Sequence, residues 1–416
     1  MVSHNSFVAF GSQGFLQKPQ KTSAALPLER IGSVGLNYKD EVSVQVHYMI
    51  WKGVIFLIKT EIANLCEAHI SQYPATQAVD LLKLLFQGEF GPGHLIADSA
   101  KNKRFLAEEY SHSRHSVPHP KFPIKHIEFI DFGFCRLHLS VIDGLGLSLD
   151  TFHRIFELSA LSQHGTNESF AYKVTVLKEL CREGFLPIDE NEINKLCSES
   201  PALFRHSEAF RTAHSPAYRV VKEEYCRHIA LLAKIDASLA QNPHTIVAID
   251  GDAASGKTTL GGILRLIYDC NVIHMDHFFL RQEQRTKERL AEPGGNVDYE
   301  RFKKEVLMPL SAQEPFNYRP FDCQTWDFGH EIEVKPNKLT VIEGCYSHHP
   351  TLADAYDIKV FLKIDAIEQM CRISLRNAPM LVERFRDIWI PMEKKYFAAF
   401  DVEKNSDLVF VHKNPS

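Results

Sequence analysis

Residues 245–268 read TIVAIDGDAASGKTTLGGILRLIY, and this stretch decides the fold of the C-terminal part of the chain. Its beginning, TIVAID (245–250), is β-branched or apolar at almost every position, as a buried parallel strand requires. Its end, TLGGILRLIY (259–268), carries apolar residues at helical spacing. Between them, Gly251–Thr258 fits G-x-x-x-x-G-K-[ST] at every fixed position. Strand, loop and helix in direct succession predict a phosphate-binding loop (P-loop).

The spacing of this loop follows from the chemistry of phosphate. Glycines let successive N–H groups turn inward toward phosphate oxygens, and the helix N-terminus adds partial positive charge. Lys257 is expected to reach the β- and γ-phosphates and to act in catalysis, and the Thr258 hydroxyl to coordinate Mg²⁺. The residues expected to bind ATP are Gly251, Asp252, Ala253, Ala254, Ser255, Gly256, Lys257, Thr258 and Thr259.

Short apolar runs continue toward the C-terminus and alternate with helical patterns. They lie at 271–275, 338–344, 357–364 and 407–412. This alternation is typical of βαβ units, so we predict an α/β domain with a parallel sheet covered by helices.

The pattern of apolar residues changes at Gln241-Asn242-Pro243. Helical spacing predominates before this segment. Residues 127–140 fit either a strand or a buried helix. We predict three regions: a poorly ordered leader at 1–53, a mainly α-helical domain at 54–240 and the P-loop domain at 244–416. The helices predicted in the middle region are 54–70, 76–87, 102–110, 149–163, 168–183, 190–198 and 216–240.

Composition narrows the class of protein. The chain has 416 residues, a net charge of −5 and nine cysteines. The acidic balance argues against a strongly basic nucleic-acid binder, and no apolar run reaches the roughly 20 residues of a membrane-spanning helix. The odd cysteine count without a CxxC pair favours reduced thiols and a cytoplasmic location. We therefore expect a small-molecule partner, with no nucleic acid and no membrane; nothing in the sequence indicates the oligomeric state.

Several classes of P-loop protein lack their signatures here. A GTPase needs N-K-x-D, but Asn337–Thr340 reads NKLT, and no LSGGQ-like segment of a transporter ATPase occurs. A small-molecule kinase needs an acidic residue after the next strand and arginines that neutralise the transferred group. Asp276 directly follows the predicted strand 271–275. Four arginines lie in a helix–turn–helix pattern broken at Pro379, namely Arg372, Arg376, Arg384 and Arg386.

Taken together, these residues resemble the uridine kinase-like branch of P-loop kinases. The resemblance covers residues 244–412, about two fifths of the chain. The segments that carry it are IDGDAASGKTTL (249–260), MDHFFL (275–280), NVDYERFKKEVLMPL (296–310), YRPFDCQT (318–325), VIEG (341–344) and the arginine-containing 372–396.

The resemblance implies roles for individual residues. Asp276 would orient or deprotonate the acceptor hydroxyl, unless it only caps a helix. Glu343 would hold a Mg²⁺-bound water, with a strand-end surface carboxylate as the alternative. Arg372 and Arg376, one helical turn apart, would act from a lid over the phosphates, or form a solvated helix face. The residues that would contact the sugar or base of the acceptor are Tyr318, Arg319 and Asp322.

The function implied is an ATP- and Mg²⁺-dependent kinase that phosphorylates a hydroxyl of a nucleoside such as uridine or cytidine. One stretch departs from the family: Arg281–Gly295 does not resemble the nucleoside-binding insert of uridine kinases. Non-nucleoside acceptors such as pantothenate, phosphoribulose or glycerate therefore stay open. An ATP-binding regulatory protein is the alternative from outside the enzymes.

The middle region carries no catalytic signature, although it resembles a helical domain found beside uridine kinase-like domains in some bacterial proteins. Two polar clusters stand out, Glu89–His94 and His206–Glu208, the second followed by Pro216–Arg219. Glu89, His94 and His206 would form a polar pocket for a metal or nucleotide. The alternative is a Gly-Pro turn, helix caps and hydrogen-bonded histidines.

Overall fold

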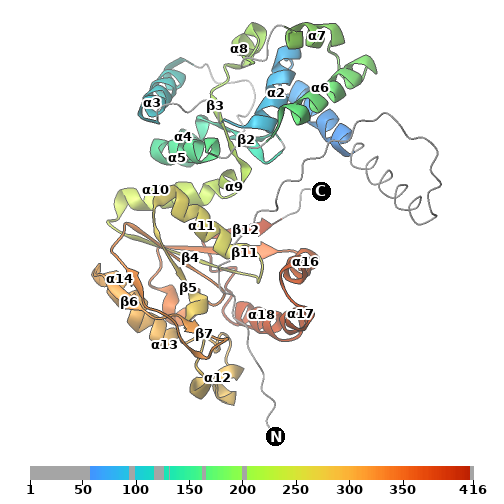
Figure 1. Cartoon of the computed structure of the whole chain (residues 1–416). Coiled ribbons are helices and arrows are strands. Elements are labelled where there is room, and N and C mark those ends of the chain that lie inside the picture. The colour runs from blue at the N-terminus through green and yellow to red at the C-terminus, as the bar shows by residue number, and fades with distance from the viewer. Residues whose placement is uncertain are drawn as a thin grey trace, which may run out of the picture.

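The computed structural model describes residues 57–92, 99–116, 126–130, 132–161, 165–198 and 204–412. The predicted leader at 1–53 and the predicted site residue His94 lie outside these residues. Figure 1 shows the chain in two parts, with the N-terminal elements above the sheet of the C-terminal part.

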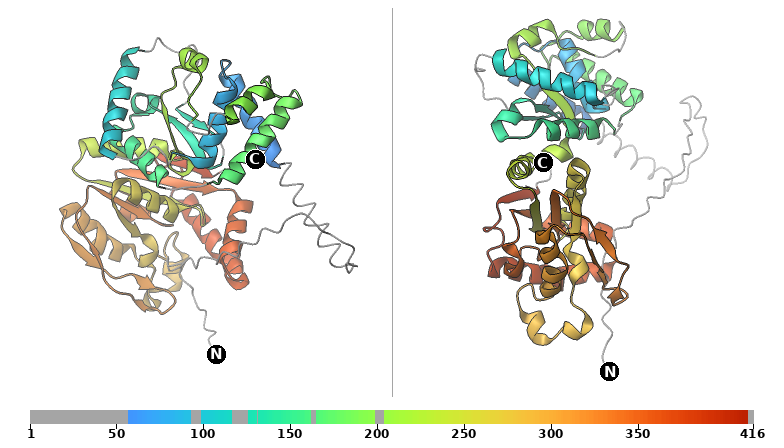
Figure 2. Two further views of the ribbon diagram at one scale, coloured as in Figure 1. Left: turned by 45° about the horizontal axis from the view of Figure 1, so that its top comes forward. Right: turned by 90° about the vertical axis from the view of Figure 1, so that its left-hand side faces the viewer.

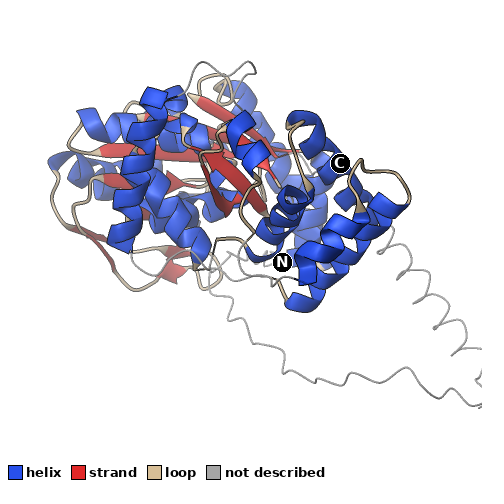
Figure 3. Ribbon diagram, turned by 90° about the horizontal axis from the view of Figure 1, so that it is seen from above, coloured by secondary structure: helices blue, strands red, loops and turns tan. Residues whose placement is uncertain are grey.

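A five-stranded sheet forms the centre of the C-terminal part, as the sequence predicts. Its strands are β4 (Thr245–Gly251), β5 (Asn271–His274), β10 (Leu339–Glu343), β11 (Ile358–Ile364) and β12 (Leu408–His412). They pair in the order β12-β11-β4-β10-β5, and all four pairings are parallel. Helices surround the sheet when the molecule is seen from above (Figure 3).

Strand β4 is apolar on both faces because each face supplies a different core. Val247 and Ile249 belong to a cluster with α10 (Ile229–Gln241) and α11 (Lys257–Tyr268). Their neighbours Ile246 and Ala248 point the other way, into a second cluster that includes Tyr396. The alternation of strand side chains thus explains why a buried parallel strand carries no polar face.

The strand order places the ends of β4, β10 and β5 side by side. Glu343 at the end of β10 is paired with Ile249 of β4 and with His274 of β5. The chain leaves β4 toward β5 on one side, whereas β11 lies on the other side of β4. Such a reversal at the carboxyl ends of parallel strands is where α/β proteins bind ligands.

Two excursions from the sheet follow the expected pattern. The predicted helix–turn–helix near the C-terminus consists of α16 (Ala366–Arg376) and a helical run from α17 (Pro379–Arg384) through 385–389 to α18 (Ile390–Ala399), so Pro379 begins the second part. Between β5 and β10 the elements are η2 (Met275–Phe278), α12 (Lys287–Ala291), α13 (Tyr299–Phe302), α14 (Met308–Ala312), β6 (Phe316–Tyr318), β7 (Phe321–Asp322), β8 (Asp327–Phe328) and β9 (Ile332–Val334).

The N-terminal part is mainly helical, as predicted, but it also contains a small antiparallel sheet. Its strands pair in the order β1-β2-β3. Its elements are a helix over 57–72, α2 (Ala78–Phe90), α3 (Ser99–Ser116), β1 (Ile127–Phe129), β2 (Phe134–His138), α4 (Ser140–Leu145), α5 (Leu149–Ala160), α6 (Asn167–Arg182), α7 (Glu190–Ser198), α8 (Glu208–His214), β3 (Tyr218–Lys222), α9 (Glu223–Cys226) and α10.

Two helix predictions in this part need correction. The helix predicted over 216–240 is wrong at its start, because Tyr218–Lys222 is strand β3 and the long helix begins only at Ile229. Pairing with β2 on the sheet outweighs the helical pattern of the surrounding residues. Helix α2 also continues past the predicted end at residue 87 and stops at Gly91, whose φ of +57° favours glycine.

One hydrophobic cluster joins the two parts across the predicted boundary at 241–243. It includes Phe152 and Leu232 from the N-terminal part and Val247 and Val360 from the sheet. Polar contacts reinforce it, since the Tyr268 hydroxyl donates to Asp236 Oδ1 at 3.0 Å. The two views in Figure 2 show the N-terminal elements over this side of the sheet.

All nine cysteines fall within the described residues and are free thiols, as predicted. Among the helices that the structure describes, none combines the length and the apolar character required to cross a membrane.

Candidate active site

Glycine is required at two positions of the loop between β4 and α11. Gly251 has a φ of +139°, and a Cβ there would lie 2.1 Å from the carbonyl oxygen of Leu362. Gly256 has a φ of +101° and caps the N-terminus of α11. The backbone path of a phosphate-binding loop is therefore possible only because both residues lack a side chain.

The loop amides divide into two groups. Four of them already donate hydrogen bonds that shape the loop: those of residues 251, 252, 253 and 255 donate to Asp250, Leu362, Glu393 and Asp252. The amides of residues 254 and 256–258 make no hydrogen bond with any described residue. These four, at the N-terminus of α11, are the ones available to an anion.

Lys257 lies over the loop. Its ammonium group donates to the carbonyl oxygens of Gly251 and Asp252 at 2.8 and 2.9 Å. Burial alone would lower its pKa, but the neighbouring Cys345, Glu393 and other acidic groups raise the pKa overall. The side chain is thus held as a cation where the motif requires one.

Thr258, Glu343 and His274 form a connected polar group beside the loop. The Thr258 hydroxyl lies 3.1 and 3.2 Å from the two carboxylate oxygens of Glu343. His274 Nδ1 hydrogen-bonds the same carboxylate, and this bond raises the pKa of His274. A hydroxyl and a carboxylate are the oxygen ligands that Mg²⁺ prefers, so these residues fit a magnesium site.

Asp276 follows β5 in η2 and faces the same region. Its side chain is open to solvent. Even so, desolvation by the surrounding protein and the negative charge of Glu343 raise the pKa of Asp276 to about 6. The positive charges of Lys257 and His274 oppose this rise. A carboxylate with a pKa just below neutral is suited to accept a proton at pH 7.

The two predicted lid arginines differ in their surroundings. Arg372 donates to the Ala254 carbonyl oxygen at 3.3 Å and to Glu368 at 2.7 Å, and it contacts His412. It therefore reaches the P-loop. Arg376 is exposed and makes no hydrogen bond or ion pair with the described residues. Arg386 pairs with its neighbour Asp387, away from the loop residues.

The three residues expected to contact the acceptor are held in a small hairpin region. The hydroxyl of Tyr318, which is buried, lies 3.1 Å from Nδ1 of His277. Arg319 donates to the Gly329 carbonyl, and Asp322 accepts from the Gln324 amide at 2.7 Å. Tyr318 thus contacts η2, whereas Arg319 and Asp322 bond within the segment 319–329, and the role of all three toward a substrate stays a prediction.

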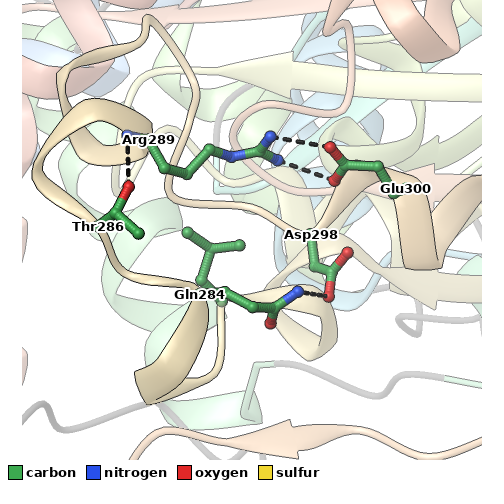
Figure 4. Close-up of a pocket in the computed structure, with 6 residues that line it drawn as sticks. Gln284, Thr286, Arg289, Asp298 and Glu300 are labelled. Carbon is green, nitrogen blue, oxygen red and sulfur yellow. Dashed lines mark hydrogen bonds and ion pairs between the residues drawn. The ribbon is translucent and has the colours of Figure 1, made fainter.

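A pocket of about 390 Å³ lies in the stretch that departs from the family pattern, separate from the P-loop (Figure 4). Arg289 reaches across it to form a two-pronged ion pair with Glu300, at 2.8 and 2.9 Å. The lining residues are Leu280, Gln284, Thr286, Arg289, Asp298 and Glu300. None of the P-loop residues and none of the residues predicted to contact the acceptor line this pocket.

Sequence reasoning missed three side chains that support the loop. His274 lies two residues before Asp276 in the sequence, but nothing in that position indicates a contact with Glu343. The contact arises because β5 and β10 pair in the sheet. Glu393 accepts from the Ala253 amide and Gln369 donates to the Ala253 carbonyl. Both come from helices more than 110 residues away in sequence, so no local pattern could reveal them.

Of the two interpretations of the N-terminal polar clusters, hydrogen-bonded side chains fit the described residues Glu89 and His206. Glu89 is buried and binds Lys173 at 2.5 Å, together with the Thr166 amide and the Ser169 hydroxyl. His206 instead bonds Asp80 at 2.8 Å and the Tyr218 hydroxyl at 2.6 Å. Among the described residues, no group of three or more His, Cys, Asp and Glu side chains could hold a metal ion, in this part or elsewhere.

His206 belongs to a continuous buried polar network centred on Arg136, which is fully buried. Arg136 donates to Gln87 at 2.8 and 3.0 Å and to Glu128 at 3.1 Å. Gln87 in turn donates to the Tyr218 hydroxyl at 3.2 Å. The network joins helices and all three strands of the small sheet.

Arg136→Lys is expected to destabilise the N-terminal part. A lysine ammonium cannot reproduce the planar fork toward both partners, so a buried acceptor is left unsatisfied. The expected loss is about 1–3 kcal/mol of unfolding free energy, measured by chemical denaturation. Arg182→Lys, at an exposed ion pair with Glu190, is the matched control and should change stability by less than about 0.5 kcal/mol. Equal losses in both variants would contradict a structural role of the network.

No family model matches the chain. The chain is 31% identical over 170 residues to nicotinamide riboside kinase 2 of Homo sapiens, which corresponds to 36% of this chain and 66% of that protein. The chain thus spans 66% of the length of this curated relative.

Solved structures of kinases are also similar. A possible uridine kinase from Bacillus stearothermophilus matches with a TM-score of 0.33 and 20% identity, over 43% of this chain and 98% of that chain. A shikimate kinase from Bacteroides thetaiotaomicron matches with a TM-score of 0.22 and 14% identity, over 40% of this chain and 85% of that chain.

Proposed function

We propose that the C-terminal part of the chain is a P-loop kinase domain of the uridine kinase type, which transfers the γ-phosphoryl group of ATP to a hydroxyl of a nucleoside. The observation that carries the proposal is the alignment of three strand ends. It brings the P-loop, the Thr258–Glu343–His274 group and Asp276 to one edge of the sheet.

The P-loop would hold the phosphates of ATP. The free amides of residues 254 and 256–258 lie at or just before the N-terminal end of α11, and Lys257 supplies the positive charge. Arg372 already contacts the loop, and Arg376 is free to turn toward transferred phosphate. Preorganised positive charge of this kind stabilises the charge that develops on phosphoryl transfer.

Thr258 and Glu343 are the residues that would hold Mg²⁺. When bound, the ion neutralises charge on the phosphate oxygens. The chain's own contribution is orientation: His274 fixes the Glu343 carboxylate, whose two oxygens lie within hydrogen-bond distance of Thr258. Such support of a ligand by a neighbouring side chain typically sets metal affinity.

Asp276 would accept the proton of the acceptor hydroxyl. A pKa of about 6 leaves most of the carboxylate ionised at pH 7 while keeping it basic enough to take a proton. The hydroxyl oxygen then attacks the γ-phosphorus, and ADP departs. The proton on Asp276 returns to solvent after the product leaves.

The acceptor class rests on the curated relative, whose name designates a kinase of nicotinamide riboside, itself a nucleoside. Uridine and cytidine remain candidates for the acceptor. Free thiols at all nine cysteines support a cytoplasmic location.

A panel of acceptors tests this function. The full-length protein is incubated with Mg²⁺ and ATP and with uridine, cytidine, nicotinamide riboside, pantothenate, glycerate or phosphoribulose, and phosphorylated products are detected by mass spectrometry. We expect stoichiometric conversion of at least one nucleoside. Conversion of a non-nucleoside instead would overturn the acceptor class. ATP binding without phosphorylation of any acceptor would favour an ATP-binding regulatory protein.

A further inference from the structure

Two helices of the predicted lid hydrogen-bond the backbone of one residue of the P-loop. Glu393 of α18 accepts a hydrogen bond from the Ala253 amide at 3.0 Å, and Gln369 of α16 donates to the Ala253 carbonyl, also at 3.0 Å. Both side chains are buried, with 7% and 3% of their surface exposed. The two polar backbone atoms of Ala253 are therefore fixed from outside the loop, by helices that follow it by more than 110 residues.

Apolar packing ties the same elements together. Ala253 forms a small core with Ile373 of α16 and Ile390 of α18. Ala254 packs against this core and has a φ of +59°, which is costly for a residue with a side chain. The chain keeps alanine at this left-handed position, where its methyl group contacts the lid. The loop and the lid helices are thus one packed unit.

The charge of Glu393 is unusual for a residue beneath an anion-binding loop. A buried carboxylate is costly unless it is paired or hydrogen-bonded. Burial raises the pKa of Glu393 to about 7, while Lys257 and the Ala253 amide oppose the shift. The charged and titratable groups around it are Lys257 from α11, Asp250 from β4, Asp252 from the loop, and Cys345 and Tyr346 after β10.

The positive charge of Lys257 opposes the rise in the pKa of Glu393 and so favours its carboxylate form. The proposed function assigns the same lysine to the nucleotide phosphates. A nucleotide on the loop would therefore draw this positive charge toward itself and add negative charge close to Glu393. Both changes favour the neutral, protonated form of the side chain.

We propose that Glu393 is a positioning residue for the nucleotide, which fixes Ala253 and through it the free amides of the loop, and which takes up a proton from solvent when Mg·ATP binds. The proposal rests on the proposed function in one respect, that ATP binds at this loop. The protonated acid keeps one oxygen free to accept from the Ala253 amide, so positioning survives while the charge is removed.

Calorimetry with a non-hydrolysable ATP analogue and Mg²⁺, without acceptor, tests this. Binding is measured at pH 7 in buffers of different ionisation enthalpy, which gives the number of protons taken up. We expect the wild type to take up as much as about half a proton more than Glu393→Gln, since a group with a pKa of about 7 is half ionised at pH 7. The protons of the nucleotide itself cancel in this comparison.

Affinities separate positioning from charge. Glu393→Gln keeps an acceptor for the Ala253 amide and should bind the analogue at least as tightly as the wild type, with an affinity that changes less between pH 6 and 8. Glu393→Leu loses the acceptor and should bind about 10-fold more weakly or worse. Glu403→Gln, at an exposed ion pair with Lys363, is the matched control and should behave as the wild type.

Equal proton uptake by the wild type and Glu393→Gln would overturn proton uptake by Glu393. Unchanged affinity of a folded Glu393→Leu, checked by its melting temperature, would overturn positioning. If Glu393→Leu does not fold, Gln369→Leu, which removes the grip on the Ala253 carbonyl, takes its place in the affinity test. Lys257→Ala separates this proposal from the proposed function: unweakened nucleotide binding in that variant would show that ATP binds elsewhere.

Discussion

Lys257→Ala is expected to lower kcat by about 10²–10³-fold with the acceptor that the panel identifies. The variant loses the cation that stabilises charge on the β- and γ-oxygens of ATP. It also loses the two bonds from the ammonium group to the carbonyls of Gly251 and Asp252. Nucleotide affinity should therefore fall as well. The measurements are steady-state turnover and equilibrium binding of a labelled ATP analogue.

Lys335→Ala provides the control. This lysine directly follows β9, is largely exposed, and among the described residues its ammonium group forms an ion pair only with Glu333. It should retain wild-type turnover and binding. Near-native turnover of Lys257→Ala would rule out phosphoryl transfer at this loop. A melting temperature close to that of the wild type excludes misfolding as the cause of a loss.

Asp276→Asn is expected to lower kcat by about 10²–10⁴-fold while leaving Mg·ATP affinity nearly unchanged. The amide keeps the size of the side chain but cannot accept the proton of the acceptor hydroxyl. Since the P-loop and Lys257 supply the phosphate contacts, nucleotide binding does not depend on this carboxylate. Turnover, ATP affinity and melting temperature should be measured on one preparation.

The pH profile gives a second reading of Asp276. The base must be ionised to act, and its pKa is about 6, above its usual range. In the wild type kcat/KM should therefore fall as the pH drops through about 6, and this limb should be absent from the residual activity of Asp276→Asn. Asp354→Asn, at an exposed site, is the control and should keep both the rate and the profile.

A purely structural aspartate would behave differently. Loss of a helix cap would lower the free energy of unfolding by about 0.5–2 kcal/mol, the cost typical of a cap. The melting temperature and the nucleotide affinity would then fall together. Unchanged turnover of Asp276→Asn would remove this residue from the mechanism and leave activation of the acceptor without a base. The two variants thus separate the binding of the donor from the activation of the acceptor.

The sequence by itself determined the core of the C-terminal domain. All five strands of the sheet lie where short apolar runs predicted them, and the P-loop joins β4 to α11 as its motif required. These features can be recognised from neighbouring residues alone. A strand and a helix repeat their apolar positions every few residues, and a glycine turn is defined by a short motif. Asp276 and Glu343 could also be predicted from the sequence, because Asp276 directly follows a predicted strand and Glu343 lies at the end of another.

Where tertiary contacts competed with local pattern, the sequence was misleading. The helical pattern predicts one helix over 216–240, but pairing with β2 makes Tyr218–Lys222 a strand. The polar clusters around Glu89 and His206 are compatible with a shared pocket or with separately hydrogen-bonded side chains. The structure gives each its own partners, Lys173 for one and Asp80 for the other.

Only the tertiary structure decided which side chains meet at the site. His274 reaches Glu343 because β5 and β10 are neighbours in the sheet, although the two residues are 69 positions apart. Glu393 reaches the Ala253 amide over 140 positions, through the return of α18 to the P-loop. Such contacts follow from the order of the strands and the packing of helices on them, and the energy that selects that arrangement is the burial of apolar surface over the whole domain. Spacing along the chain therefore determined the elements and the P-loop, whereas the shared core determined the groups that hold and tune it.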